Sequence, residues 1–183
     1  MSDPIPIPDH PEAAAAAPAV SILVISYNTR AMTLACLASV IAETTVPYEL
    51  IVLDNASPDG SAEAIAAAFP AAAHPELRLI ASRENHGFAK GNNIAAREAR
   101  GELLLLLNPD TLVKDKAIDR LVAFAGRTPE AGIWGGRTLT GEGRLDPGCV
   151  FADQTLWSLV CRATGLAGPS APLGHMPSRL TLH

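Results

Sequence analysis

The chain has 183 residues, of which 48% are hydrophobic, 18% are charged and 4% are aromatic. At about 150 residues per domain, this length indicates one domain with a short extension, and the hydrophobic fraction excludes a chain that is disordered throughout. The net charge of −5 argues against a protein that binds nucleic acid through its phosphates, since that mode of binding needs clustered Lys and Arg.

The first 18 residues contain five prolines, three acidic residues and no lysine or arginine. They lack the basic and apolar regions of a secretory signal peptide, so we expect residues 1–18 to form a disordered tail. No apolar run approaches the roughly 18 residues needed to cross a bilayer. Cys36, Cys149 and Cys161 form no CxxC pair, which argues against a zinc site or a disulfide framework. These features predict a globular domain in the cytoplasm.

From Val20 onward, strand and helix patterns alternate. The predicted strands cover residues 20–27, 48–54, 77–81 and 102–107. The predicted helices cover residues from about 30 to the low forties, 61–69 with Ser61 as its cap, 88–100 with Gly101 as its end, and 114–127. The almost wholly apolar run at 20–27 is typical of a strand that is buried on both faces. This order predicts an α/β fold with a mostly parallel sheet, helices on both of its faces and right-handed crossovers.

Beyond Trp134 the alternation weakens. Residues 140–143 predict a turn between short extended pieces, and residues 153–163 predict a last amphipathic helix. Residues 165–183 are expected to be irregular, because Gly, Pro and Ser break any period there.

Polar residues follow every predicted strand. They are Tyr27, Asn28 and Thr29 after the first strand, Asp54 and Asn55 after the second, residues 85–93 after the third, and Asn108, Pro109 and Asp110 after the fourth. Ligands of open parallel sheets bind beyond the carboxyl ends of the strands. The sequence therefore predicts a binding site at this edge of the sheet.

The common phosphate-binding fingerprints are missing. No glycine-rich turn follows the first strand, and Glu142 and Gly143 stand where a P-loop needs Lys and Ser or Thr. A nucleotide would be held in another way: Asp54 could accept a hydrogen bond from a base imino group, and Lys90 beside a helix N-terminus could face phosphates. The alternatives are an Asx-type turn at Asp54 and Asn55 and a solvated surface lysine.

Asn108, Pro109 and Asp110 follow a run of five leucines. A carboxylate at the end of a buried strand is held rigidly, and Mg²⁺ and Mn²⁺ prefer such oxygen ligands. Because one aspartate does not hold a metal by itself, we expect Asp110 to share a divalent cation with a diphosphate. The alternative is that Asp110 caps the next turn through the amide of Thr111 or Leu112.

Four strings carry a family resemblance: VSILVISYN at 20–28, IVLDNASPDGS at 51–61, ENHGFAKGNNIAAREARGELLLLLNPDT at 84–111 and, more weakly, GRLDPGCVFAD at 143–153. Together they resemble the family 2 glycosyltransferases of the GT-A fold, in particular a bacterial rhamnosyltransferase-like branch. The resemblance implies a nucleotide-sugar-binding GT-A domain with a Rossmann-like sheet over residues 19–151. It also implies that residues 152–183 form a short helix and an irregular tail in place of the acceptor-binding part.

The same resemblance implies a set of site residues. Those that would hold the base and ribose of a nucleotide-diphosphate sugar are Tyr27, Asn28, Asp54 and Asn55. Those that would line the nucleotide and its diphosphate are Gly87, Phe88, Lys90 and Asn93. Asn108 would stand at the first acidic position of a DxD-type motif, and Asp110 would bind Mg²⁺ or Mn²⁺.

The family's reaction is an inverting, metal-dependent sugar transfer, here from dTDP-rhamnose or a UDP-sugar to a cell-envelope polysaccharide or a lipid-linked acceptor. It needs a cation on the leaving diphosphate and a base for the acceptor hydroxyl. The family's base lies in a downstream Glu-Asp motif that this chain lacks. Glu142, Asp146 and Asp153 remain as candidates, although none of them belongs to an acidic pair.

Two hypotheses follow. The chain is either a glycosyltransferase, alone or as the donor half of a longer enzyme, or a truncated module that binds nucleotide sugar without transferring it. A nucleotidyltransferase of related fold is disfavoured, because its glycine- and arginine-rich loop is absent. A lipid-linked acceptor would bring peripheral contact with the inner face of the cell membrane, although no basic or amphipathic segment demonstrates it.

Overall fold

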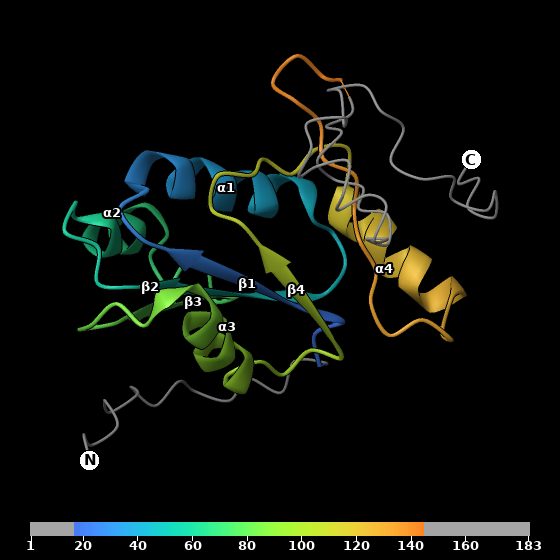
Figure 1. The fold of residues 1–183 in the computed structure, drawn as a ribbon, viewed down its shortest axis with the longest axis horizontal. Helices are drawn as coiled ribbons and strands as arrows, with labels where there is room; N and C mark the ends of the chain where they lie inside the picture. The colour runs from blue at the N-terminus through green and yellow to red at the C-terminus, as the bar shows by residue number, and fades with distance from the viewer. Residues whose placement is uncertain (1–16, 145–183) are drawn as a thin grey trace, which may run out of the picture. The chain divides into compact units, whose positions relative to one another are not determined.

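The computed structural model describes residues 17–144, and its centre is a four-stranded parallel sheet with the strand order β3-β2-β1-β4 (Figure 1). The strands are β1 (Val20–Ser26), β2 (Tyr48–Asp54), β3 (Leu77–Ala81) and β4 (Leu103–Leu107). The parallel sheet predicted from the alternating pattern is confirmed. Its register pairs Ser26 with Asp54 and Asp54 with Ala81, so the carboxyl ends of these three strands are level.

Helices cover both faces of the sheet, as predicted (Figure 1). They are α1 (Arg30–Glu43), α2 (Ser61–Ala68), α3 (Gly87–Arg97) and α4 (Ala117–Arg127). On one face, Leu37 of α1, Ile65 of α2 and Ile118 of α4 belong to one core cluster with side chains of β1 and β2. On the other face, Ala95 of α3 packs with Leu23 and the neighbouring apolar side chains of the sheet.

Gly91 lets α3 lie close to the sheet. A Cβ at this position would lie 3.1 Å from Cγ2 of Ile25 and 3.2 Å from Cδ2 of Leu53. Such contacts are tighter than ordinary packing, so a larger residue here would push the helix away. The glycine therefore helps to hold the N-terminus of α3 at the carboxyl ends of β1 and β2.

Two predicted helix boundaries are wrong. Helix α3 ends at Arg97 with Glu98 as its C-cap, short of the predicted end at Gly101. Helix α4 begins at Ala117, because the two residues before it have left-handed φ values, 52° at Asp115 and 53° at Lys116. Residues in that region of φ/ψ space interrupt a right-handed helix.

The start of α2 also differs from the prediction. Ser61 is the first helical residue, and the N-cap is Gly60 with a φ of 74°. The backbone N–H of Ser61 donates a 3.1 Å hydrogen bond to Oδ1 of Asp59. The carboxylate of Asp59 thus accepts the first N–H of the helix, whereas Ser61, the predicted cap, is itself the first helical residue.

Strand β4 is not buried on both faces in the described part of the chain. Leu103, Leu105 and Leu107 pack against the cluster beneath α1, whereas Leu104 and Leu106 are 51% and 55% exposed. Helix α3 covers β1 and β2 but does not extend over β4. A run of five leucines is equally hydrophobic on both faces of the strand. The sequence pattern therefore could not show which face is covered by a helix.

The chain divides into two compact units, Met1–Trp134 and Gly135–His183. In the second unit, the predicted turn is present: the N–H of Thr140 donates to the carbonyl of Arg144 at 2.7 Å, and the N–H of Gly143 donates to the carbonyl of Thr140 at 2.8 Å. The predicted tail up to residue 16, the helix at 153–163 and the irregular segment after it lie outside the described residues. Across residues 17–144, no helix has the length and apolar character to span a membrane.

Candidate functional site

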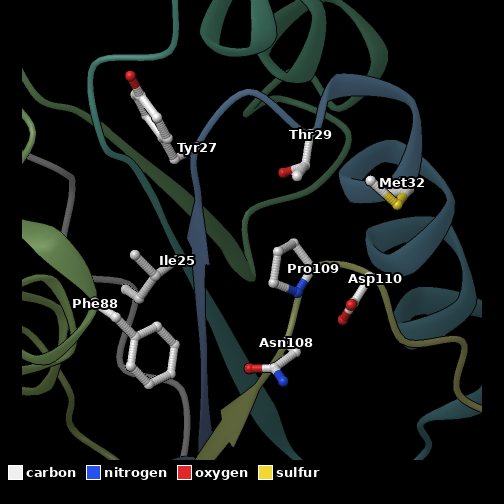
Figure 2. A pocket seen from close by; sticks show the side chains of 8 residues that line it. All are labelled: Ile25, Tyr27, Thr29, Met32, Phe88, Asn108, Pro109 and Asp110. Carbon is white, nitrogen blue, oxygen red and sulfur yellow. The ribbon is translucent and has the colours of Figure 1, made fainter.

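A pocket of about 260 Å³ lies at the carboxyl ends of the strands (Figure 2). It is lined by the end of β1 and the loop after it, the first turns of α1 and α3, and the turn after β4. Its lining residues are Ile25, Tyr27, Thr29, Met32, Phe88, Asn108, Pro109 and Asp110. Figure 2 shows Tyr27 and Phe88 on one side of β1 and the residues that follow β4 on the other. Four predicted site residues, from three separate stretches of sequence, thus share one pocket. Thr29 and Pro109, which the sequence places after the first and fourth strands, also line the pocket. Ile25 and Met32 complete the lining and were not predicted at this edge.

Asp54 is a buried carboxylate, only 3% exposed, at the end of β2. Its Oδ2 accepts a 3.0 Å hydrogen bond from the N–H of Ser57. Its Oδ1 is buried and has no hydrogen-bond partner among the residues that the structure describes. The turn expected as the alternative role of Asp54 therefore occupies one oxygen only. A buried acceptor without a donor is unfavourable, so a ligand that donates an N–H here would relieve a local deficit.

The side chain of Asn55 is fully engaged inside the protein. Its Oδ1 accepts a 2.8 Å hydrogen bond from the N–H of His86, and its Nδ2 donates to Oδ1 of Asn85 at 2.8 Å. The same Asn85 oxygen accepts the N–H of Gly87 at 2.8 Å. Asn55 therefore ties the end of β2 to the entry of α3. Asn85 was predicted only as one of the residues that follow the third strand and was given no role of its own, although an Asx residue two positions before a glycine is a turn signal.

The loops after β1 and β2 are joined by hydrogen bonds. The N–H of Asn28, whose φ is 54°, donates to Oγ of Ser57 at 3.0 Å. The N–H of Arg30 donates to Oδ2 of Asp59 at 3.0 Å. A positive φ is tolerated by Asn more readily than by most residues. Tyr27, which directly precedes Asn28, is exposed and lines the pocket.

Helix α3 starts at Gly87, whose φ of 73° turns the chain into the helix. Phe88 lines the pocket, whereas Lys90 and Asn93 are exposed outside its lining. The Nζ of Lys90 lies 3.9 Å from Oε1 of Glu84, and both side chains are largely solvated. Lys90 is thus a surface lysine beside a helix N-terminus, and the carboxylate of Glu84 partly neutralises its charge.

Asn108, Pro109 and Asp110 form a turn after β4. The N–H of Thr111 donates a 3.2 Å hydrogen bond to the carbonyl of Asn108, which leaves that amide unavailable to Asp110. Pro109 occupies the second position of the turn, where its fixed φ is favourable. The side chains of Asn108 and Asp110 are both exposed at the pocket (Figure 2).

This donor set suits a shared divalent cation. Within residues 17–144, no group of three or more His, Cys, Asp or Glu side chains is placed to hold a metal ion. Asp110 and Asn108 offer hard oxygen donors of the type that Mg²⁺ and Mn²⁺ prefer. Two side chains leave most of an octahedral shell open, so the remaining ligands would have to come from water and a bound diphosphate.

The predicted candidates for a catalytic base belong to the second unit of the chain. Glu142 is exposed and paired with Arg144 in the second unit. Asp146 and Asp153 lie outside the described residues. The base therefore stays a prediction without structural support.

Residues 21–147 match the family described as "Glycosyl transferase family 2". Over 116 residues, the chain is 30% identical to the succinoglycan biosynthesis protein ExoO of Rhizobium meliloti, a match that covers 63% of this chain and 32% of that protein. Over 167 residues, it is 32% identical to the O-antigen biosynthesis protein RfbC of Myxococcus xanthus, which covers 86% of this chain and 12% of that protein. The chain thus spans about a third of the length of ExoO and much less of RfbC.

A solved structure shares the architecture. It is the mannosyltransferase PcManGT of Pyrobaculum calidifontis, in complex with GDP-Man and Mn²⁺, with a TM-score of 0.54 and 28% identity over 68% of this chain and 36% of that one. The GT-A fold that the resemblance implied is confirmed by this match together with the parallel sheet.

Proposed function

Because the chain belongs to glycosyl transferase family 2, we propose that it binds a nucleotide-diphosphate sugar and serves an inverting, metal-dependent transfer of that sugar to an acceptor hydroxyl. The observation that carries the proposal is that Oδ1 of Asp54 is buried without a hydrogen-bond partner within residues 17–144, at the same sheet edge as the exposed carboxylate of Asp110. Oδ1 of Asp54 can accept an N–H from a ligand, and the carboxylate of Asp110 can bind a cation.

Asp54 is the residue that recognises the base. Uracil, thymine and guanine each carry an imino N–H, which can donate to Oδ1 without disturbing the Oδ2 bond to Ser57. Asn28 and Tyr27 lie beside this position on the loop that Ser57 holds in place. Asn55 supports the site from within, since its hydrogen bonds fix the chain between Asn85 and Gly87.

The diphosphate is placed between α3 and the turn after β4. The N-terminus of α3 offers the positive end of a helix dipole. The ammonium group of Lys90 would turn from the carboxylate of Glu84 to the diphosphate. Gly87 and Phe88 shape the entry of the helix, and Asn93 lies further along it.

Asp110, with Asn108, would hold a Mg²⁺ or Mn²⁺ ion together with the diphosphate. When bound, the cation supplies stabilisation of the negative charge that develops on the leaving nucleoside diphosphate. Asp110 brings the carboxylate that anchors the cation in the pocket, and Asn108 brings a neutral oxygen beside it. Because Asn108 is neutral, Asp110 is the only charged side chain among the described residues that line the pocket.

For the donor we propose dTDP-rhamnose or a UDP-sugar, and for the acceptor a cell-envelope polysaccharide or a lipid-linked saccharide. ExoO and RfbC are named for the biosynthesis of succinoglycan and O-antigen, which supports a polysaccharide product. PcManGT, in complex with GDP-Man and Mn²⁺, supports a nucleotide sugar and a divalent cation as ligands of the site. A lipid-linked acceptor would place the reaction in the cytoplasm at the inner face of the membrane.

The test is calorimetric titration of the full chain with UDP, dTDP and GDP, each with and without Mn²⁺. We expect one nucleotide to bind more tightly when Mn²⁺ is present. If none of the three binds with or without the metal, the proposed function is wrong. Turnover of dTDP-rhamnose or a UDP-sugar with an acceptor then separates a transferase from a module that only binds nucleotide sugar.

A further inference from the structure

Three polar side chains along one face of α1 contact the segment that follows β4. Cys36, Ser39 and Glu43 are spaced three and four residues apart, the spacing of one helix face. Their partners are, in the same order, the carbonyl of Asn108 at 3.7 Å, the N–H of Val113 at 2.9 Å and the N–H of Lys116 at 3.2 Å. We call these three side chains the α1 seam.

Ser39 is the centre of the seam. Its hydroxyl donates a 2.7 Å hydrogen bond to the carbonyl of Cys36 and accepts the N–H of Val113. Val113 is buried, so without Ser39 its amide would lose a partner away from water. The hydroxyl thus fixes the backbone three residues after Asp110 to the backbone of α1.

Cys36 holds the other end of the same turn. It is fully buried, and its Sγ donates to the carbonyl of Asn108, which also accepts the N–H of Thr111 at 3.2 Å. Cys36 therefore binds the backbone where the turn begins, at Asn108, and Ser39 binds the backbone beyond the turn, at Val113. Asp110 lies between these two supports with an exposed side chain, so the turn itself determines where the carboxylate points.

We propose that Ser39, supported by Cys36, is a positioning residue for Asp110 and thereby sets the strength of metal-dependent nucleotide binding. The inference rests on the proposed function, because it assigns the turn to a bound cation. Cation ligands work within narrow limits of distance and direction, so loosening the chain that carries Asp110 weakens the site without removing any ligand.

The test compares Ser39→Ala with a matched control, Thr128→Val. The hydroxyl of Thr128 also donates to a helix carbonyl, that of Phe124, and accepts an N–H, from Trp134 at 2.8 Å, but it lies at the far end of α4. Each variant is titrated with UDP, dTDP and GDP in the presence and absence of Mn²⁺. Amide hydrogen exchange of Thr111 and Val113, followed by NMR, reports on the turn without any ligand.

We expect Ser39→Ala to reduce the gain in nucleotide affinity from Mn²⁺ by about tenfold, the effect of one lost hydrogen bond. Affinity without the metal stays at the wild-type value, and the amides of Thr111 and Val113 exchange faster. Ser39→Thr keeps the hydroxyl and restores the metal gain, whereas Thr128→Val leaves it unchanged.

Equal metal gains in Ser39→Ala and wild type overturn the inference, as does a loss of the same size in Thr128→Val. If wild type itself shows no metal gain with any of the three nucleotides, the metal-dependent function is wrong and this role of Ser39 with it. Amide exchange at Thr111 and Val113 separates a failure of the Ser39 role from a failure of metal binding. It shows whether Ser39 holds the turn even when no ligand binds.

Discussion

The backbone N–H of Ser57 donates a 3.0 Å hydrogen bond to Oδ2 of Asp54 and leaves Oδ1 of the same carboxylate buried without a partner in the described chain. One oxygen is therefore engaged within the protein, and the other is the atom to which the proposed nucleotide would donate. The division arises because the loop after β2 folds back over the strand end, a position that also brings Ser57 to the N–H of Asn28.

Asp54→Asn is expected to weaken nucleotide binding tenfold or more, both with and without Mn²⁺. The asparagine oxygen can still accept the N–H of Ser57, but its NH₂ group then faces the imino donor of the base. A hydrogen bond to a charged group contributes about 1.5–3 kcal/mol. Calorimetry with UDP, dTDP and GDP measures the loss. Asp119→Asn, which alters a carboxylate that binds Thr45 and Val46 instead, serves as the control. Wild-type affinity in Asp54→Asn would contradict the base contact.

Asp110→Asn is expected to remove most of the affinity that Mn²⁺ adds, because the variant keeps the shape of the turn and loses the charge on the cation ligand. Asp115→Asn is the matched control: it lies in the same loop, is exposed and has a φ of 52° that Asn accommodates. Titration with Mn²⁺ and then with EDTA measures the metal gain. A full metal gain in Asp110→Asn would assign the cation to another ligand.

Glu49→Gln is expected to destabilise the fold. Glu49 is 5% exposed and accepts hydrogen bonds from Oγ of Ser21 at 2.6 Å and from Nε of Arg100 at 3.1 Å. Burial alone would raise the pKa of Glu49, but these bonds and the Arg100 charge outweigh it and hold the pKa below its ordinary value. Since the Arg100 side chain is mostly solvated, we expect a loss of roughly 1–2 kcal/mol in the free energy of unfolding.

The same shift in pKa predicts the pH dependence of stability. A folded-state pKa below the unfolded value stabilises the protein above the ordinary pKa of glutamate, and this contribution disappears as the pH falls through the folded value. Urea unfolding between pH 7 and the acid range measures the effect in wild type and in Glu49→Gln, where the Glu49 part of it should vanish. Glu102→Gln, at an exposed carboxylate nearby, should keep the wild-type profile.

Gly101→Ala is expected to destabilise the fold by about 1–3 kcal/mol. A Cβ at this position would lie 2.6 Å from the backbone N of Ser21 and 2.8 Å from the backbone C of Val20, so strand β1 would have to shift. Gly126→Ala is the control, since no atom of the described residues lies within 4 Å of a Cβ there and alanine favours the helix. Thermal unfolding compares the two variants, and equal melting temperatures would show that the space at Gly101 is larger than the structure indicates.

Much of the fold was predictable from local patterns. The predicted strands 48–54 and 77–81 match β2 and β3 to the residue, because their apolar runs are bounded by turn residues. The predicted C-terminal end of α3 and the predicted start of α4 were wrong, because local backbone conformation rather than residue type sets these boundaries. Gly101 reads as a helix end by its type, yet it is needed for a close approach to β1 that no local pattern contains.

The candidate site was predictable in outline only. Polar residues after the strands meet at one edge because parallel strands align their carboxyl ends. The engagement of Asn55 was hidden, since its partners Asn85 and His86 lie about 30 residues away in the sequence and join it only through the sheet register. The lining by Met32 was hidden too, because an apolar residue in a helix gives no sign of facing a pocket.

By itself, the sequence determined that this chain forms an α/β fold with a parallel sheet, and that Asp54 and Asp110 stand at strand ends. These properties follow from hydrophobic periodicity and residue type, which act over a few neighbouring positions. Only the tertiary structure decided that β4 pairs with β1, that Oδ1 of Asp54 has no partner in the part of the chain that the structure describes, and that Ser39 holds the segment after Asp110. These depend on hydrogen bonds between residues far apart in the chain, whose partners are chosen by packing of the whole sheet and its helices.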